Sequence, residues 1–87
     1  MVTNEMRQKR WEQNYHLTNN ETVRIWIDDF LEIKNKMSLD ECTAEEILAE
    51  IEENKESMDN FRMWGDRHAV VDCEEYIEVL EAMLEVT

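Results

Sequence analysis

The chain contains no proline and a single glycine, and this restricts its fold more than any other feature. Strands and hairpins are bounded by turn residues, of which glycine and proline are the strongest. Apolar residues instead recur at three- and four-residue spacing, which is typical of amphipathic helices. The sequence therefore predicts an all-α fold, a compact bundle of three to four helices in one domain (1–87), with helices at approximately 4–15, 19–36, 44–63 and 67–86.

The two predicted N-terminal helices differ in character. The first is polar, with a thin apolar stripe of Met6, Trp11 and Tyr15 and a basic cluster of Arg7, Lys9 and Arg10. We expect this cluster to be solvated or paired with the acidic half of the chain. The second begins at Thr18–Glu21, which matches a capping box. Its expected buried face consists of Val23, Trp26, Ile27, Phe30, Ile33 and Met37, widened by Ile25 and Leu31.

The two predicted C-terminal helices follow a second capping box, Thr43–Glu46. Gly65 is expected to end the third helix in a left-handed conformation. The last helix is then predicted to start near Asp66 or Arg67, although Asp72 is an alternative start. The expected buried positions are Ala44, Ile47, Leu48, Ile51 and Met58 in the third helix, and Val70, Cys73, Ile77, Leu80 and Leu84 in the fourth, widened by Tyr76, Val79 and Met83.

Net charge divides the chain into two unequal halves. Residues 1–37 carry six basic and six acidic side chains, whereas residues 38–87 carry three basic and sixteen acidic ones, so the net charge of −13 arises entirely in the second half. Phosphates and anionic lipids would be repelled by such a surface. We therefore expect neither direct nucleic-acid binding nor membrane binding, and expect a basic protein surface as the partner.

Glutamates in the acidic half recur with helical spacing and form two rows, one in the third predicted helix (Glu46, Glu50 and Glu53) and one in the fourth (Glu74, Glu78, Glu81 and Glu85). At a rise of 1.5 Å per residue, each row places a carboxylate about every 5–6 Å along one helix face, a density comparable with that of a nucleic-acid strand. Packed side by side, the two helices would offer a doubly lined anionic surface. The alternative is an ordinary solvated face. The candidate partner-binding residues are Glu46, Glu50, Glu53, Glu74, Glu78, Glu81 and Glu85, together with Trp64.

The sequence shows no arrangement of residues that predicts catalysis, a metal or a cofactor. A di-iron bundle needs Glu-x-x-His motifs, whereas His16 follows Glu12 by four residues and His68 follows no glutamate at that spacing. Cys42 and Cys73 lack the spacing of a metal site and are expected to be reduced and packed. We expect a protein that is not an enzyme.

The segment from Leu17 to Asp29 resembles a signature of small proteins carried by phages and mobile elements. In that signature Trp-Thr-Asn-Tyr-Glu-Thr-Trp is followed, after three residues, by Leu-Trp-Leu. The positions that match are Thr18, Asn19, Glu21, Thr22 and Trp26. Leu17, Asn20 and Val23 depart from it, and the spacing to Trp26 is shorter. Some of these proteins are similar in setting to antirestriction genes, so the resemblance implies a mobile-element origin.

The leading hypothesis is a phage-type inhibitor of a host defence system, of the anti-CRISPR or antirestriction kind, that occupies a basic nucleic-acid-binding surface. The alternative is a small dimeric adaptor that binds through Phe61, Met63 and Trp64, with acidity serving solubility only. A core this small would gain from dimerisation, so a homodimer is one expected form. The N-terminus has no apolar run and no signal peptide is expected, which indicates a cytoplasmic protein in the host cell.

Overall fold

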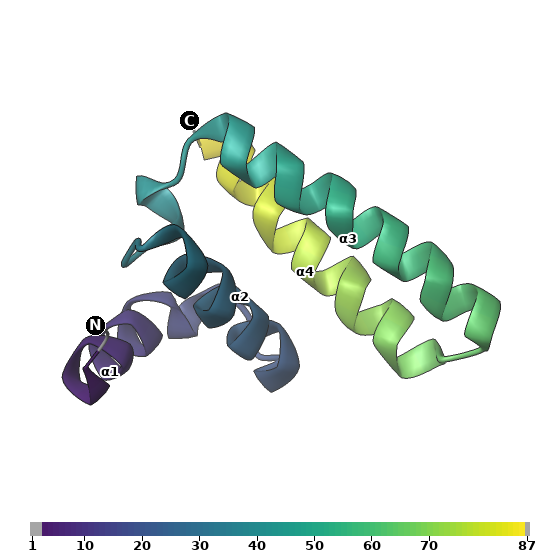
Figure 1. The fold of residues 1–87 in the computed structure, drawn as a ribbon, viewed down its shortest axis with the longest axis horizontal. Helices are drawn as coiled ribbons and strands as arrows, with labels where there is room; N and C mark the ends of the chain where they lie inside the picture. The colour runs from purple at the N-terminus through teal and green to yellow at the C-terminus, as the bar shows by residue number, and fades with distance from the viewer. Residues whose placement is uncertain (1–2, 87) are drawn as a thin grey trace. The chain divides into compact units, whose positions relative to one another are not determined.

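The computed structural model describes residues 3–86, and these form an all-α fold without strands (Figure 1), as the sequence predicts. The chain divides into two compact units, Met1–Cys42 and Thr43–Thr87. No helix among residues 3–86 is long and apolar enough to cross a membrane. The elements in order are α1 (Asn4–Asn14), the 3-10 helix η1 (Tyr15–Leu17), α2 (Glu21–Lys34), the 3-10 helix η2 (Leu39–Glu41), α3 (Ala44–Trp64) and α4 (Arg67–Val86).

In the first unit, α1 packs against α2 with polar side chains. Arg10 and Asn14 are buried, at 2% and 6% exposure. Asn14 donates to two backbone carbonyl oxygens, of Arg10 at 2.7 Å and of Met37 at 3.0 Å. The predicted stripe on α1 is wrong, because Met6 and Tyr15 are exposed. The sequence pattern missed the true inner face because arginine and asparagine are rarely buried unless they find partners elsewhere in the chain.

The buried face of α2 is narrower than predicted. Val23, Ile27, Phe30 and Leu31 are buried, whereas Ile25 and Ile33 are exposed, Ile33 at 80%. Each residue turns a helix by about 100°, which places Ile33 about 100° from the centre of this buried face. Trp26 and Met37 are partly buried.

The start of α2 lies two residues later than the predicted capping box. Asn20, not Thr18, is the N-cap, and its Oδ1 accepts hydrogen bonds from the amides of Thr22 at 2.9 Å and Val23 at 3.3 Å. The Thr18 hydroxyl instead accepts from the amide of Asn20 at 3.1 Å. Both residue types are good caps, so the sequence alone does not decide between them.

The second unit is an antiparallel helical hairpin of α3 and α4, which run side by side in Figure 1. The predicted capping box at its start is present, since the Thr43 amide donates to Glu46 Oε1 at 2.9 Å and the Glu46 amide to Thr43 Oγ1 at 3.1 Å. Ala44 and Leu48 are exposed rather than buried as predicted. The buried residues among those described are Ile47, Ile51, Cys73, Tyr76, Ile77, Leu80 and Met83.

Gly65 ends α3 as the sequence predicts. Its φ of 76° lies in the left-handed region, and the amides of Gly65 and Asp66 donate to the carbonyl oxygens of Arg62 and Phe61 at 3.1 and 2.9 Å. Asp66 Oδ1 then accepts from the amide of Ala69 at 3.1 Å. Because Asp66 caps the next helix, α4 begins at Arg67, and the alternative start at Asp72 is excluded.

Candidate functional site

The predicted partner-binding residues all lie on the hairpin, but Glu46 and Glu50 have structural contacts. Besides capping α3, Glu46 is partly buried. Glu50 is also partly buried, and its Oε2 accepts from the hydroxyl of the buried Tyr76 at 2.7 Å. That bond joins α3 to α4, so Glu50 contributes to the packing of the hairpin. Glu53 is exposed.

The remaining four predicted glutamates form an exposed line on α4, which we call the α4 row: Glu74, Glu78, Glu81 and Glu85. Glu74 lies 3.4 Å from Nη2 of Arg62 and is partly neutralised. Among residues 3–86, no hydrogen bond or ion pair engages Glu78, Glu81 or Glu85. The negative charge of this part of α4 is therefore open to solvent.

The two predicted glutamate rows lie on opposite flanks of the hairpin. Tyr76 contacts Glu50 on one flank, and Glu74 contacts Arg62 on the other. Glu74 and Tyr76 are separated by about 160° around α4, which is why they reach different flanks of α3. The prediction of a doubly lined anionic surface is therefore wrong. The sequence gives the spacing within each row but not the rotation of one helix relative to the other.

Two exposed acidic side chains of α3, Glu52 and Asp59, have cations close by. Lys55 lies 3.7 Å from Glu52, and Arg62 lies 3.7 Å from Asp59 as well as near Glu74. Exposed pairs of this kind contribute roughly 0–1 kcal/mol each to stability, but they reduce local negative potential. Among the described residues, Glu78, Glu81 and Glu85 have no such relief, and neither have Glu45, Glu53 and Glu56 of α3. The α4 row is the candidate for contact with a basic partner because its four glutamates follow one another in a single exposed line.

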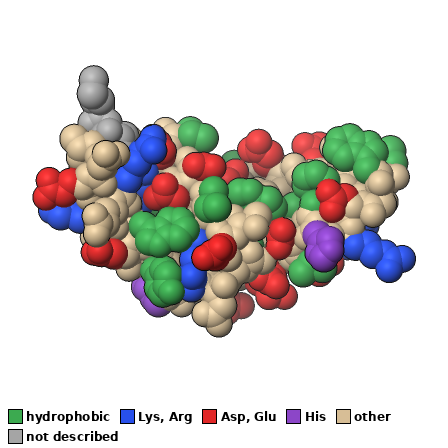
Figure 2. Space-filling model, turned by 90° about the horizontal axis from the view of Figure 1, so that it is seen from below, with side chains coloured by type: hydrophobic (Ala, Val, Ile, Leu, Met, Phe, Trp, Pro, Cys, Tyr) green, Lys and Arg blue, Asp and Glu red, His purple; other side chains and the backbone are tan. Residues whose placement is uncertain are grey.

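The turn between α3 and α4 presents apolar side chains to solvent. Met63 and Trp64 are 79% and 71% exposed, while Phe61 is partly buried and meets the Trp64 ring edge-on, with centroids 5.9 Å apart. Figure 2 shows hydrophobic side chains gathered at this end of the hairpin, at the right of the view. We call Met63 and Trp64 the tip. As the sequence suggested for Trp64, the tip is available to a partner.

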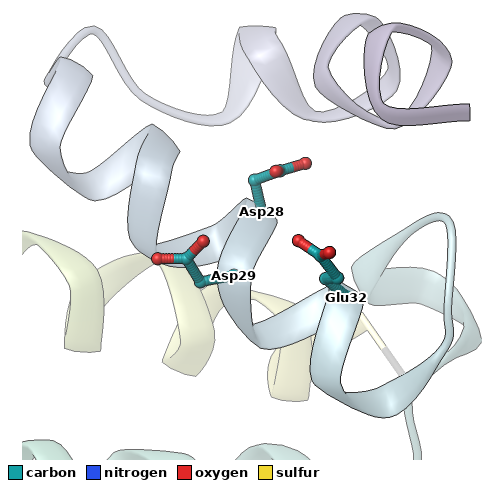
Figure 3. A group of neighbouring side chains, drawn as sticks. All are labelled: Asp28, Asp29 and Glu32. Atoms are coloured by element: carbon teal, nitrogen blue, oxygen red, sulfur yellow. The ribbon is translucent and has the colours of Figure 1, made fainter. Parts of the chain in front are cut away.

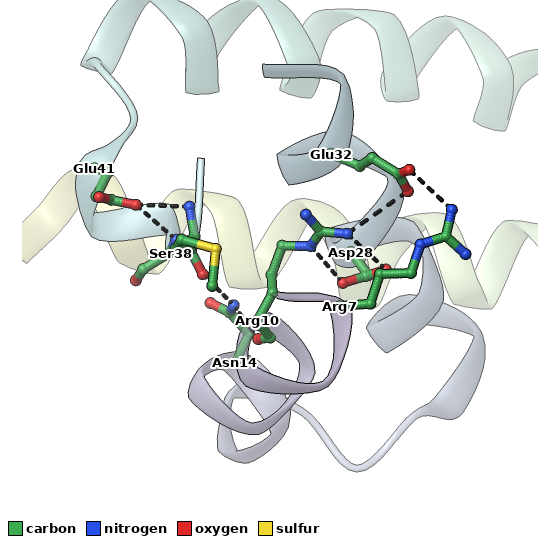
Figure 4. Close-up of polar contacts among 8 residues, drawn as sticks. Arg7, Arg10, Asn14, Asp28, Glu32, Ser38 and Glu41 are labelled. Atoms are coloured by element: carbon green, nitrogen blue, oxygen red, sulfur yellow. Dashed lines mark hydrogen bonds and ion pairs between the residues drawn. The ribbon is translucent and has the colours of Figure 1, made fainter. Parts of the chain in front are cut away.

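An acidic trio on α2 was not singled out by the sequence pattern. The carboxyl groups of Asp28, Asp29 and Glu32 lie within 4.8 Å of one another (Figure 3). Two arginines of α1 form ion pairs with members of this trio (Figure 4). Arg10 Nε lies 2.7 Å from Asp28 Oδ1, and Arg7 Nη2 lies 3.0 Å from Glu32 Oε1. A cation would compete with these guanidinium groups, so Asp28 and Glu32 are best explained as the anionic side of an ion-pair network.

The same ion-pair network shows which residues two members of the N-terminal basic cluster contact. Arg10 also lies 3.6 Å from Glu32, and its side chain is only 3% exposed. Arg7 and Arg10 thus pair with α2 in their own unit. The expectation that the cluster is solvated or paired with the acidic half is wrong for Arg10, whereas the Arg7 side chain is 56% exposed. Residues 1–37 carry equal numbers of basic and acidic side chains, and some of these pair with each other within this segment.

The two cysteines are buried, and Cys73 does not offer a reactive thiolate. As predicted, both are buried, and no disulfide joins them. Burial, and secondly the negative charge of Asp72, raise the pKa of the Cys73 thiol above its ordinary value of 9.0. A thiol with a raised pKa remains neutral at physiological pH and is a poor nucleophile.

No protein-family model, curated protein or solved structure matches this chain.

Proposed function

We propose that this protein binds a basic surface of a nucleic-acid-binding protein and thereby excludes nucleic acid from it. The observation that supports this proposal best is the α4 row, in which Glu78, Glu81 and Glu85 are exposed and unpaired within residues 3–86. A line of like charges on a helix costs stability through repulsion between neighbours. Such a line is most useful where a partner supplies the missing cations.

The most concrete form of this function is a phage or mobile-element inhibitor of a host defence system, of the anti-CRISPR or antirestriction type. The net charge of −13 and the resemblance of Leu17–Asp29 to mobile-element proteins support it. Complementary charge steers association and sets its dependence on salt. The inhibitor would therefore associate fast at low ionic strength and lose affinity as salt is added.

The test is affinity capture of host proteins on the immobilised chain, followed by addition of oligonucleotides. If the function is as proposed, nucleic acid releases the captured partner, and retention decreases between low and high salt. The double variant Glu78→Gln/Glu81→Gln should bind the partner about 10-fold more weakly at low salt, since exposed charge pairs contribute up to about 1 kcal/mol each.

A matched control removes the same charge from the neighbouring helix. Glu45 and Glu56 on α3 are exposed, like Glu78 and Glu81. Glu45→Gln/Glu56→Gln should therefore leave affinity within about 2-fold if the α4 row makes the contact. This variant lowers the net charge by the same amount, which mainly affects the association rate, but it removes no contact with the partner. Equal losses in both double variants, or binding that is insensitive to salt and to nucleic acid, would contradict the proposal.

The exposed tip favours a second candidate, an adaptor that binds a protein partner through Phe61, Met63 and Trp64, with acidity serving only solubility. Exposed tryptophan is among the commonest sources of binding energy in interfaces. Under this second function, Trp64→Ala abolishes binding while Glu78→Gln/Glu81→Gln retains it. The first function requires the glutamine variant to lose affinity.

A further inference from the structure

One exposed face of α4 runs almost the whole length of the helix. Arg67 and Val71 lie nearest the turn, and the α4 row follows them, all of them exposed. The six residues are separated by four, three, four, three and four positions, so at about 100° per residue they stay within about 80° of one another around the helix. Among residues 3–86, only Glu74 of this face takes part in an ion pair. It is therefore an unpartnered helix face with its negative charge toward the C-terminal end.

The charges on α4 are arranged against the helix dipole, unlike those on the two helices before it. Both α2 and α3 have glutamate in their first turns and a cation, Lys34 or Arg62, in their last. In α4 the first turn begins at Arg67 and has no acidic residue, while the last turn contains Glu85 and no basic residue. A helix dipole favours anions at the first turn and cations at the last. The C-terminal glutamates of α4 thus lower the stability of the free helix, and cations brought by a partner would relieve this cost.

Spacing within the α4 row matches that of a second helix better than that of an extended chain. Glu74 and Glu85 are eleven positions apart, which at a rise of 1.5 Å gives a mean interval of about 5.5 Å between carboxylates. A helix packed alongside repeats its facing positions at the same interval, because alternation of three and four positions is the seam spacing of paired helices. A strand repeats one side about every 6.7 Å, so its cations would be about 3.5 Å out of register by the fourth glutamate. Of the two, the helix keeps all four pairs aligned.

Charge decides whose helix fits this face. Nucleic acid and anionic membranes would be repelled by it. A second copy does not fit either. Within residues 3–86, four of the cations on helices are already ion-paired, and the others are distributed over three helices: Lys9, Arg24, Lys34 and Arg67. The occupant must therefore be a helix of another protein that presents a line of cations.

We propose that the contact element of the partner is a basic α-helix, which packs along α4 with its arginines or lysines opposite the α4 row. This inference rests on the proposed function and specifies the partner. It agrees with that function because many proteins enter the major groove of DNA with helices that carry cations. A helix covered by α4 would be excluded from the groove.

The experiment titrates three synthetic peptides into the full chain at low salt and measures their affinities by calorimetry. The first is an alanine-based peptide of about 18 residues, long enough to form a helix, with four arginines spaced by four, three and four positions. The second has the same composition with its arginines five positions apart, which at about 100° per residue distributes them around the helix. The third is the first peptide with a central proline, which breaks the helix.

The first peptide should bind at least about 10-fold more tightly than either of the others, because only the first peptide presents four cations to the α4 row at once. Glu78→Gln/Glu81→Gln should weaken its binding about 10-fold. The matched control Glu45→Gln/Glu56→Gln, which removes two exposed charges from α3, should change its affinity less than about 2-fold.

Equal affinity for the three peptides, equal losses in both double variants, or no binding of the first peptide overturns the inference of a helical partner. The proposed function is tested separately, by capture of host proteins and their release by nucleic acid. A partner that is captured and released in that test, together with equal affinity for the three peptides, leaves the proposed function standing and removes only the helix.

Discussion

At the scale of single residues, the environment of a charged side chain depends on partners that are distant in sequence. Arg10 lies in a cluster that could face solvent, yet its guanidinium is buried against Asp28, eighteen positions later. Glu50 and Glu78 have the same chemistry and similar helical context, but only Glu50 finds a tyrosine hydroxyl. The described contacts therefore divide the glutamates into structural residues and candidates for binding.

Removal of the Arg10 side chain should destabilise the protein strongly. Arg10→Ala leaves Asp28 without its guanidinium, and breaking a fully buried pair costs roughly 3–5 kcal/mol. Because the Asp28 and Glu32 side chains are 20% and 30% exposed, we expect about 2 kcal/mol in urea unfolding followed by circular dichroism. Arg7→Ala removes a more exposed pair and should cost less than about 1 kcal/mol. Equal losses would show that burial of Arg10 is unimportant.

The buried Cys73 thiol should react slowly and should make stability depend on alkaline pH. Its pKa is raised in the folded state, so the stability that it contributes is complete below the ordinary value of 9.0 and is lost as pH rises through the folded value. In a Cys42→Ser background, a thiol reagent at pH 8 should label the folded protein far more slowly than the unfolded one. The free energy of unfolding should fall less steeply above pH 9 in Cys73→Ala. Rapid labelling of the folded chain would contradict this account.

At the scale of elements, helix ends are fixed by local chemistry. The capping box Thr43–Glu46 and the glycine end at Gly65 were predicted because each requires only residues within one turn. Another such box, Ser38–Glu41 at η2, was not predicted, although the same chemistry is present there. The error at Thr18 has a similar origin, because two good caps stand two residues apart and only the geometry selects Asn20.

Substitution of Gly65 tests how far the turn depends on backbone conformation. A Cβ at Gly65 would meet no atom within 4 Å, so the cost of Gly65→Ala arises from the left-handed φ of 76° and should be about 1–2 kcal/mol. Asn35 adopts a similar φ of 56° at the end of α2. Asn35→Gly should therefore be neutral or stabilise by a few tenths of a kcal/mol. Thermal unfolding of both variants provides the measurement, and a neutral Gly65→Ala would contradict this explanation.

At the scale of the whole molecule, a net charge of −13 on 87 residues sets the behaviour in solution. Repulsion among like charges opposes a compact chain. Most of the acidic half is unrelieved by nearby cations, since only three basic residues accompany sixteen acidic ones. The protein tolerates this repulsion in the free state, and a cationic partner would remove it.

Added salt should therefore stabilise the free protein. Between 0.01 and 1 M sodium chloride the screening length falls from about 30 to about 3 Å, and the free energy of unfolding should rise on the order of 1 kcal/mol. Urea unfolding at both salt concentrations checks this. The increase should be smaller in Glu78→Gln/Glu81→Gln, in which part of the repulsion is absent. A salt effect of the opposite sign would show that ion pairs outweigh self-repulsion.

The candidate site was predictable in part. The exposure of the α4 row follows from a helix that keeps its apolar residues on the opposite side, which the sequence reveals directly. Glu46 and Glu50 are not available to a partner as predicted, because Glu46 caps α3 and Glu50 accepts a hydrogen bond from Tyr76 of the neighbouring helix. Met6 and Ile33 were predicted to be buried but are exposed. Periodicity shows which residues share a helix face but not which neighbouring segment will cover that face.

The sequence by itself determined the helical class, the four helices to within about two residues, the ends at Thr43 and Gly65, and the excess of negative charge in the second half. All of these depend on interactions within one or two helical turns or on composition alone. Only the tertiary structure decided that the glutamate rows face opposite flanks, that Arg10 is buried and that Glu74 is paired. These features depend on how one helix is rotated against another, and that rotation is set by side-chain packing between segments far apart in the chain.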